Sequence, residues 1–375
     1  MSYRGDVTEA ALDQLATALF SSLRRVDQRT RGLEYLHGLL RAEGRKSIRN
    51  IAAATTGRAG EQSLHHFISD STWDWLPVRR ALTDYLVTRK PPQAWVLKLL
   101  TIPKAGNHSV GVVRRLDTQR GRARNAQHAF GVWAANEEVS SPVHWRLHLT
   151  EEWLSDEGRR QRTSIPDHVT AEPFETGGVS TFLEAAAWPE SPTRPVVLDA
   201  RNLDVLETFR RLRAARIPLL ARIGGRTPLL GIRPGAQPAP AHHVLAAARD
   251  LCRPVSWTEP APLPTTRTCL AAAVRARLPG LGQDLLLLGV APLGRPWPAE
   301  LWLTDLPAIR PTGLVRLTTL MNRVDQDLAN IAEPMGIRDF AGRSFSGWHR
   351  HVTLASAAHA LAVLGAPTRQ VRYTG

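Results

Sequence analysis

Basic side chains are the most prominent chemical feature of this sequence. Its 375 residues include 48 Lys and Arg against 34 Asp and Glu, which gives a formal net charge of +14 at pH 7. Ammonium and guanidinium groups neutralise phosphates, so nucleic acid is the expected polyanionic partner. An arginine-rich proteome, in which Arg replaces Lys without a binding role, is the alternative explanation. Residues 117–125 form a basic, glycine-broken segment that predicts a hairpin loop.

Residue types that often build metal or nucleophilic sites lack the spacing that such sites need. Histidine groups such as His65-His66 and His349-x-His351 have no cysteine or carboxylate partner at zinc spacing. The two cysteines, Cys252 and Cys269, indicate a reducing compartment rather than a disulfide framework. No apolar run reaches the roughly 18 residues that a membrane span requires. We therefore expect a cytoplasmic protein, associated with the nucleoid if DNA is its partner.

Helical periodicity dominates the N-terminal part of the chain, residues 5–90. Leu12, Leu15 and Leu19 recur at the spacing of one helix face, and the pattern continues along the segment. Pro91 and Pro92 then end it. We expect a helical domain here.

A buried strand at 95–100 opens the next part, followed by a turn at 103–107 and a second strand from residue 109. Strands at 127–135 and 143–149 continue an antiparallel meander. An apolar strand at 196–199 ends in an acid, and a helix at 203–215 and a strand at 217–223 follow. This β-α-β unit predicts a mixed α/β sheet.

The C-terminal third combines short strands with two long helices. Residues 224–314 are rich in Pro and Gly and predict β-structure interrupted by loops, with short apolar runs at 284–290 and 300–304 and one helix near 241–249. An amphipathic helix is expected at 312–334 and an apolar closing helix at 352–364.

Several of these stretches resemble the DDE transposases of bacterial insertion sequences, cut-and-paste enzymes with an RNase H-like catalytic domain. The run Ile102-Pro103-Lys104-Ala105-Gly106, followed by Ser109-Val110-Gly111-Val112, is similar to the family's Phe-Pro-Lys-Lys-Gly turn and Ser-Val-Gly-Val strand. Trp73-Asp74 before an arginine-rich helix and Gly347-Trp348-His349-Arg350-His351 also match the family. The resemblance runs from Leu23 to about Leu364 and is weakest across 224–310.

The resemblance implies an α/β fold with an RNase H-like mixed sheet. It divides the chain into a helical DNA-binding domain at 1–92, a first core part at 93–223, a β-rich insertion at 224–314 and C-terminal core helices at 315–375. Members of this family act as pairs, so the partners expected besides DNA are a second copy of the chain and proteins of a larger complex.

The same resemblance places Lys98, Asp199 and Asp325 at the positions of the three catalytic acids. DDE chemistry requires three carboxylates around two divalent cations, and Mg²⁺ requires hard oxygen ligands. A protonated lysine cannot ligate, and Met321 and Ala332 replace the Arg and Lys of the family's signature. We therefore expect an inactivated site with Asp199 and Asp325 as remnants, no metal or other cofactor, and an ion pair between Lys98 and Asp199.

Charge and resemblance together assign DNA contact to basic residues of the N-terminal helices, of the first strands with their turn and loop, and of the Gly347–His351 run. A solvated helix face is the alternative for those near residue 45. The expected contacts are Arg41, Arg45, Lys46, Arg49, Arg79, Arg80, Lys104, Arg114, Arg115, Arg120, Arg122, Arg124 and Arg350.

Three functions remain open at this point. The first is a transposase-derived protein that binds double-stranded DNA in a regulatory or architectural role, or as a subunit of a nucleoprotein complex. The second is a Mg²⁺-dependent transposase or nuclease with a remodelled site that uses Asp199 and Asp325, helped by Asp204 or Asp117. The third is a protein-binding scaffold whose charge is incidental.

Overall fold

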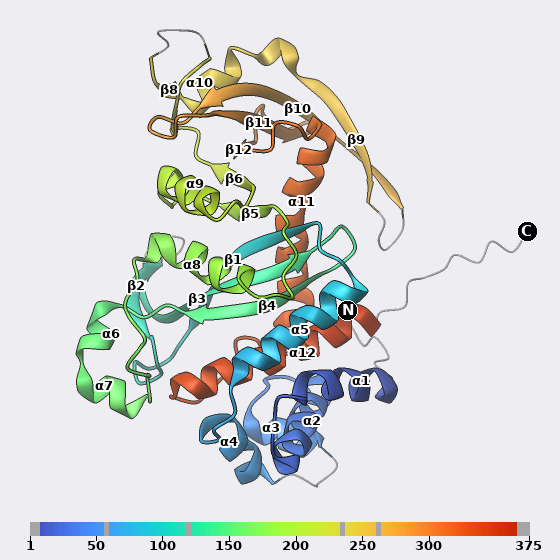
Figure 1. The fold of residues 1–375 in the computed structure, drawn as a ribbon, viewed down its shortest axis with the longest axis vertical. Helices are drawn as coiled ribbons and strands as arrows, with labels where there is room; N and C mark the ends of the chain where they lie inside the picture. Colours follow the sequence, from blue (N-terminus) through green and yellow to red (C-terminus); the bar gives the residue numbers. More distant parts are fainter. Residues whose placement is uncertain (1–7, 56–59, 118–121, 233–236, 260–263, 366–375) are drawn as a thin grey trace, which may run out of the picture.

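The computed structural model describes residues 8–55, 60–117, 122–232, 237–259 and 264–365, without the side chains of 115–117 and 122. The molecule is elongated, with a block of helices at one end and a sheet extension at the other (Figure 1). None of the helices within these ranges combines the length and hydropathy needed to cross a lipid bilayer.

The described residues of the N-terminal block, 8–55 and 60–89, form five helices, in agreement with the apolar periodicity. Leu12, Leu15 and Leu19 are buried, which confirms the predicted inner face. Side chains cap several helices by accepting hydrogen bonds from backbone N–H groups of the first turn. Thr8 accepts from the amide of Ala11, and Asp74 accepts from the amide of Leu76. The helices are α1 (Glu9–Phe20), α2 (Val26–Arg41), α3 (Ile48–Ala54), α4 (Glu61–Ser69) and α5 (Trp75–Arg89).

A large mixed sheet follows. Its first strands are β1 (Ala94–Pro103), β2 (Val113–Asp117), β3 (Arg122–Ala135), β4 (Ser140–Leu147), β5 (Val196–Asp199) and β6 (Leu219–Ile223). Strand β3 pairs antiparallel with β1, β2 and β4, whereas β1–β5 and β5–β6 pair in parallel. The resulting order β4–β3–β1–β5–β6 is consistent with an RNase H-like fold and confirms the predicted mixed α/β sheet.

The second strand begins at Val113, so the predicted start at residue 109 is wrong. The preceding backbone is bonded to other segments instead of a neighbouring strand: the amide of Val110 donates to the carbonyl of Arg343 (3.2 Å), and the indole of Trp153 donates to the carbonyl of Val112 (2.9 Å). Gly111 has φ +71°, which favours glycine, and its α-carbon lies against Leu149. Residues 104–112 therefore form a folded loop.

The β-rich segment extends this sheet. Strand β12 (Glu300–Thr304) pairs antiparallel with β6, and β11 (Asp284–Pro292), β10 (Thr265–Arg277) and β9 (Arg253–Glu259) follow in order. Two short strands, β7 (Pro228–Leu229) and β8 (Ala239–Pro240), pair separately beside α10 (Ala241–Ala246) and the 3-10 turn η1 (Arg249–Leu251).

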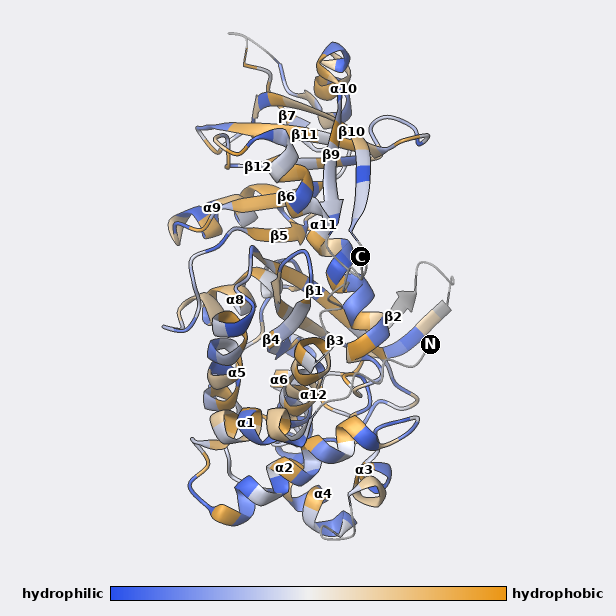
Figure 2. Ribbon diagram, turned by 90° about the vertical axis from the view of Figure 1, so that its right-hand side faces the viewer, coloured by the Kyte–Doolittle hydropathy of each residue, from blue (hydrophilic) through white to orange (hydrophobic). Residues whose placement is uncertain are grey.

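Helices cover the core part of the sheet. Those after β4 are α6 (Glu151–Ser155), α7 (Glu157–Arg162), α8 (Phe174–Ala186) and α9 (Val205–Ala214), and the C-terminal ones are α11 (Pro311–Asp327), the π-helical turn η2 (Leu328–Ala332) and α12 (Phe345–Gly365). In Figure 2 the strands β5 and β6 are predominantly hydrophobic, as strands covered on both faces should be. Helix α12 starts seven residues before the predicted helix, because the Gly347–His351 run is part of it.

Buried histidines anchor α12. The ring of His351 accepts from the hydroxyl of Tyr35 at Nδ1 (2.8 Å) and donates from Nε2 to the carbonyl of Gly336 (2.7 Å). His359 donates from Nε2 to the carbonyl of Ser140 (2.7 Å). Burial lowers the pKa of both rings to about 4, so both are neutral at pH 7.

These histidines make the fold sensitive to acid. An unfolded chain protonates them below their ordinary pKa of about 6.5, whereas the folded chain takes up the protons only near pH 4. Stability is therefore fully present above about pH 6.5 and is lost as the pH falls, by about 2 kcal/mol per histidine at pH 5. Urea unfolding measured across this pH range should show the decline in the free energy of unfolding. H359Q should reduce the slope of that free energy against pH by the equivalent of about one proton. A slope that is unchanged in H359Q would contradict this assignment.

Candidate functional site

A row of charged residues crosses β1, β5 and β6, with Asp199 at the carboxyl end of β5, Arg222 next to that of β6 and Lys98 in the middle of β1. The parallel pair β1–β5 aligns Trp95 with Val196 and Val96 with Val197. Lys98 and Asp199 each follow two residues later on their strands, so their side chains project from the same face of the sheet. Asp199 is in turn level with Arg222 in β6. The fold thus aligns a cation, an acid and a second cation across three adjacent strands.

Helix α11 packs against this edge and supplies a further acid. It contacts both β1 and β5, and the carboxylate of Asp325 forms an ion pair with the ammonium of Lys98. The exposed fractions of the two side chains are 27% for Lys98 and 50% for Asp325, so the pair is accessible from solvent. The three positions that the family resemblance selects therefore meet in space.

The expected pairing of Lys98 with Asp199 is wrong, because Asp199 has another partner. The guanidinium of Arg201 donates hydrogen bonds to the carboxylate of Asp199 from Nε (2.9 and 3.0 Å) and from Nη2 (2.5 Å). Burial alone would raise the pKa of Asp199, but the hydrogen bonds and charge of Arg201, with the charge of Arg222, outweigh it and hold that pKa below its usual value. Arg222 itself pairs with Glu300 (3.1 Å).

Each acid in this row is thus bonded to a cation of its own. No group of three or more His, Cys, Asp or Glu side chains is arranged to hold a metal ion anywhere in the described ranges. Of the acids suggested as helpers, Asp204 caps α9 by accepting from the amide of Glu207 (3.0 Å). The side chain of Asp117 lies outside the described part of the structure.

Three residues assigned to DNA contact are buried and bonded inside the protein, which overturns their assignment. Arg79 is 1% exposed, Arg350 5% and Lys46 5%. Arg350 donates to the carbonyls of Trp73 and Ile68 (both 3.0 Å), and Lys46 donates from Nζ to the carbonyl of Ala42. Arg350 thus joins α12 to the end of α4 and to the segment between α4 and α5, whereas the ammonium of Lys46 bonds within its own stretch of chain.

Arg79 is the centre of a network between α5, β4 and α12. It donates to the hydroxyl of Thr353 (2.7 Å), the carbonyl of Trp145 (2.6 Å) and the Nδ1 atoms of His144 (3.3 Å) and His349 (3.1 Å). Because arginine has no acceptor, both histidines present an unprotonated Nδ1. Burial lowers the pKa of Arg79 to about 9, so it remains charged at pH 7.

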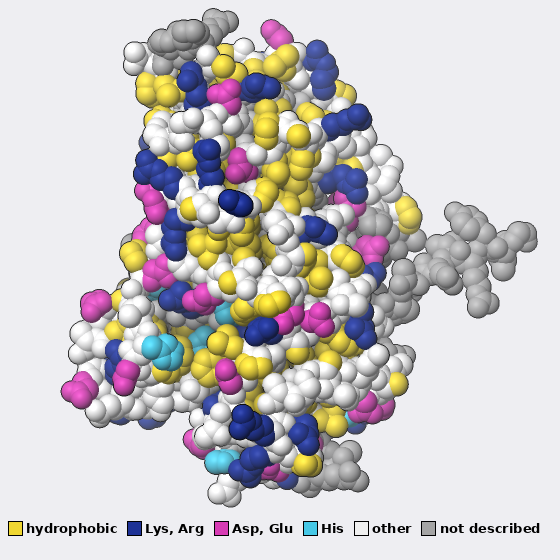
Figure 3. Space-filling model, viewed as in Figure 1, with side chains coloured by type: hydrophobic (Ala, Val, Ile, Leu, Met, Phe, Trp, Pro, Cys, Tyr) yellow, Lys and Arg dark blue, Asp and Glu magenta, His cyan; other side chains and the backbone are white. Residues whose placement is uncertain are grey.

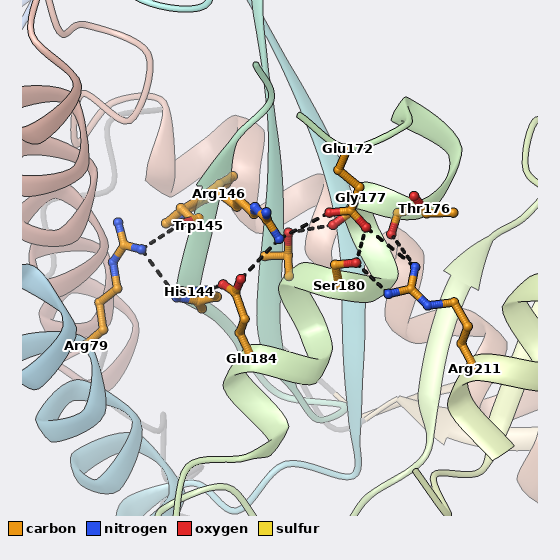
Figure 4. A network of polar contacts seen from close by, with 11 residues as sticks. Arg79, His144, Trp145, Arg146, Glu172, Thr176, Gly177, Ser180, Glu184 and Arg211 are labelled. Atoms are coloured by element: carbon orange, nitrogen blue, oxygen red, sulfur yellow. Dashed lines mark hydrogen bonds and ion pairs between the residues drawn. The ribbon is translucent and has the colours of Figure 1, made fainter. Parts of the chain in front are cut away.

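From His144 the network continues along α8 to α9, as Figure 4 shows. His144 donates from Nε2 to Glu184 (3.1 Å), and Arg146 bridges Glu184 (3.1 Å) to Glu172 (3.2 Å). Arg211 then pairs with Glu172 (3.5 Å). The network borders a pocket of about 290 Å³. The acids of this network, Glu172 and Glu184, are paired with cations, so neither is an unpaired base for catalysis. We therefore interpret the network as structural.

Other assigned residues do reach the surface. Lys104, Arg114 and Arg124 line an open hollow of about 550 Å³ between the end of β1 and the β2–β3 pair. Lys104 also donates to the carbonyl of Phe340 (2.7 Å). Burial and then the charge of Arg45 lower the pKa of Lys104 to about 8.

The remaining assigned residues divide into three groups. Arg45 and Arg49 are exposed. Arg41 pairs with Glu9, and Arg80 with Glu190 (2.8 Å). Arg120 and the side chains of Arg115 and Arg122 lie outside the described residues.

The sequence reasoning missed Arg201 and Arg222, which complete the charged row. Arg201 follows Asp199 by two residues, and this spacing after a strand end was the available signal. Arg222 gave no such signal, because its place beside Asp199 depends on strand pairing.

A family model described as DDE superfamily endonuclease matches residues 18–274, which is more than half of the chain. The match includes the N-terminal helices, Lys98 and Asp199, and it ends within β10, before the helix that carries Asp325. A comparison with curated proteins gives no match. The extent of the family match, together with the sheet order, shows that the chain belongs to the DDE superfamily endonucleases.

Proposed function

We propose that this chain is a DNA-binding member of its superfamily whose site at Lys98, Asp199 and Asp325 does not cleave DNA. The observation that carries the proposal is the ion pair between Lys98 and Asp325, on the strand beside the one that ends in Asp199. If Lys98 stands at the position of the first catalytic acid, as the family resemblance implies, a cation takes the place of a carboxylate that the superfamily's chemistry needs for metal binding.

The residues at this site do not fit a pair of divalent cations. Of the three side chains at the catalytic positions, Lys98 has no lone pair while protonated, and its charge repels a metal ion. The carboxylate of Asp325 is bonded to Lys98 and that of Asp199 to Arg201, so a metal would have to displace both. Surface ion pairs contribute only about 0–1 kcal/mol, so the missing ligand and the added positive charge matter more than the strength of these pairs.

DNA binding is supported by superfamily membership and by the hollow of Lys104, Arg114 and Arg124. The charge of +14 alone supports it less, because Arg79, Arg350 and Lys46 are used internally. On the face shown in Figure 3, Lys and Arg side chains are interspersed with Asp and Glu instead of forming one field. DNA contact therefore depends on local hollows that place several cations together. A regulatory or architectural role fits a chain that binds without cutting.

Measurements of metal binding and DNA strand cleavage test the proposal that the site does not cleave DNA. The wild-type chain should show no rise in melting temperature with Mn²⁺ and no Mn²⁺- or Mg²⁺-dependent nicking of supercoiled DNA. The double variant K98D/R201S adds a carboxylate and frees Asp199, so Mn²⁺ should stabilise it, by about 2.7 kcal/mol at a hundred times the dissociation constant. Metal-dependent nicking by the wild type that is abolished in D199A would instead support a remodelled nuclease.

Measurements of DNA affinity test the proposal that the chain binds DNA. Replacing Arg114 and Arg124 by Gln should lower the affinity for a labelled duplex and reduce the slope of log affinity against log salt by about 0.9 for each phosphate that the variant no longer neutralises. R295Q is the matched control, because Arg295 is an exposed arginine on the turn after β11, far along the chain from the hollow. A wild-type chain without salt-dependent DNA binding would leave the protein-scaffold function as the explanation.

A further inference from the structure

We infer that a second cationic hollow, lined by Arg159, Arg162 and Arg343, binds a backbone phosphate of the same DNA duplex. This inference rests on the proposed DNA binding and extends it to residues that the sequence did not assign to DNA. The hollow has a volume of about 330 Å³, and Asn107, His108, Trp153 and Thr163 complete its lining.

Three separate segments build this hollow, and hydrogen bonds hold them together. The carbonyl of Thr163, at the end of α7, accepts from the amide of Phe345, which starts α12 (2.8 Å). The carbonyl of Arg343 accepts from the amide of Val110 in the 104–112 loop (3.2 Å). The indole of Trp153 joins α6 to the same loop through the carbonyl of Val112. The hollow is therefore formed in advance of any ligand, which reduces the ordering cost of binding.

The charge inside the hollow is not balanced. Arg159 lies over the ring of Trp153 (5.3 Å) and pairs with Asp156 (3.1 Å). Within the described ranges, Arg162 and Arg343 are exposed and form no ion pair with a carboxylate. Three guanidinium groups thus share one hollow, and among them only Arg159 has an ion-pair partner in the described part of the chain. An anion relieves their mutual repulsion, and a guanidinium matches the oxygens of a phosphate in two parallel hydrogen bonds.

Position selects DNA as the source of that phosphate. The 104–112 loop contributes Lys104 to the first hollow and Asn107 and His108 to the second, so the two hollows flank one loop. Figure 1 shows α6 and α7 beside the end of the sheet that carries β2. A duplex has a phosphate about every 3.4 Å of helix axis on each strand, so one that covers the first hollow presents further phosphates to the second.

A protein partner fits this surface less well. Trp153, the large aromatic side chain of the lining, is 2% exposed and already engaged. Binding energy between proteins concentrates in accessible aromatic and apolar anchors, and the hollow offers a partner mainly charge and polar groups.

The test is the affinity of the full chain for a fluorescein-labelled DNA duplex, measured by anisotropy at several salt concentrations. R162Q/R343Q should weaken binding at each salt concentration and reduce the log–log salt slope by about 0.9, for the one backbone phosphate that the hollow no longer neutralises. R162K/R343K retains the charges and should keep the wild-type slope, a rescue that a purely structural role would not produce. R295Q should behave as the wild type. Thermal unfolding of each variant establishes that it is folded.

The outcomes separate this inference from the function on which it rests. If R114Q/R124Q loses affinity while R162Q/R343Q retains the wild-type affinity and slope, the second hollow does not contact DNA but the proposed function stands. If the wild type binds no duplex at low salt, both fail. If the effect of R162Q/R343Q appears with an RNA duplex and not with the DNA duplex, the hollow serves RNA and the inference is wrong.

Discussion

Parallel pairing of β1 with β5 is the constraint on which the rest of the site depends. Its register turns Lys98 and Asp199 toward one face of the sheet, and β6 adds Arg222 level with Asp199. Helix α11 packs across these strands and brings Asp325 to Lys98. A shift of one residue in this register would turn Lys98 to the opposite face and separate it from Asp325. Backbone hydrogen bonding between the strands therefore positions the charged row more than the ion pairs do.

The protein uses its cations in two distinct ways. Arg79 and Arg350 are buried and satisfy their donors mainly with backbone carbonyls, hydroxyls and neutral histidines. Leaving such donors without partners would cost about 1–3 kcal/mol each or more, so these arginines fix how α5 and α12 pack. Arg124, Arg162 and Arg343 are exposed and gather in hollows. Net charge cannot distinguish the two uses, because it counts buried and exposed cations alike.

Local patterns predicted most of the secondary structure. The strand 196–199 and the strand 300–304 have the predicted bounds, because short apolar runs between polar residues define their own limits. The predicted bounds were wrong where hydrogen bonds between distant segments determine the structure. Strand β2 starts at Val113 instead of residue 109, because the backbone before it is bonded to Arg343 and Trp153. Helix α12 includes the polar residues His349 and Arg350 because its environment satisfies them on all sides.

The sequence by itself determined the family resemblance, the mixed α/β class and the expectation that Lys98 stands at the position of a catalytic acid. These depend on residue identity and spacing along the chain, which a sequence contains in full. Only the tertiary structure decided which acid pairs with Lys98, that Arg79 and Lys46 face inward, and that Arg159, Arg162 and Arg343 share a hollow. Each of these depends on contacts between segments up to hundreds of residues apart. Burial and ion pairing follow from such contacts, and no local pattern encodes them.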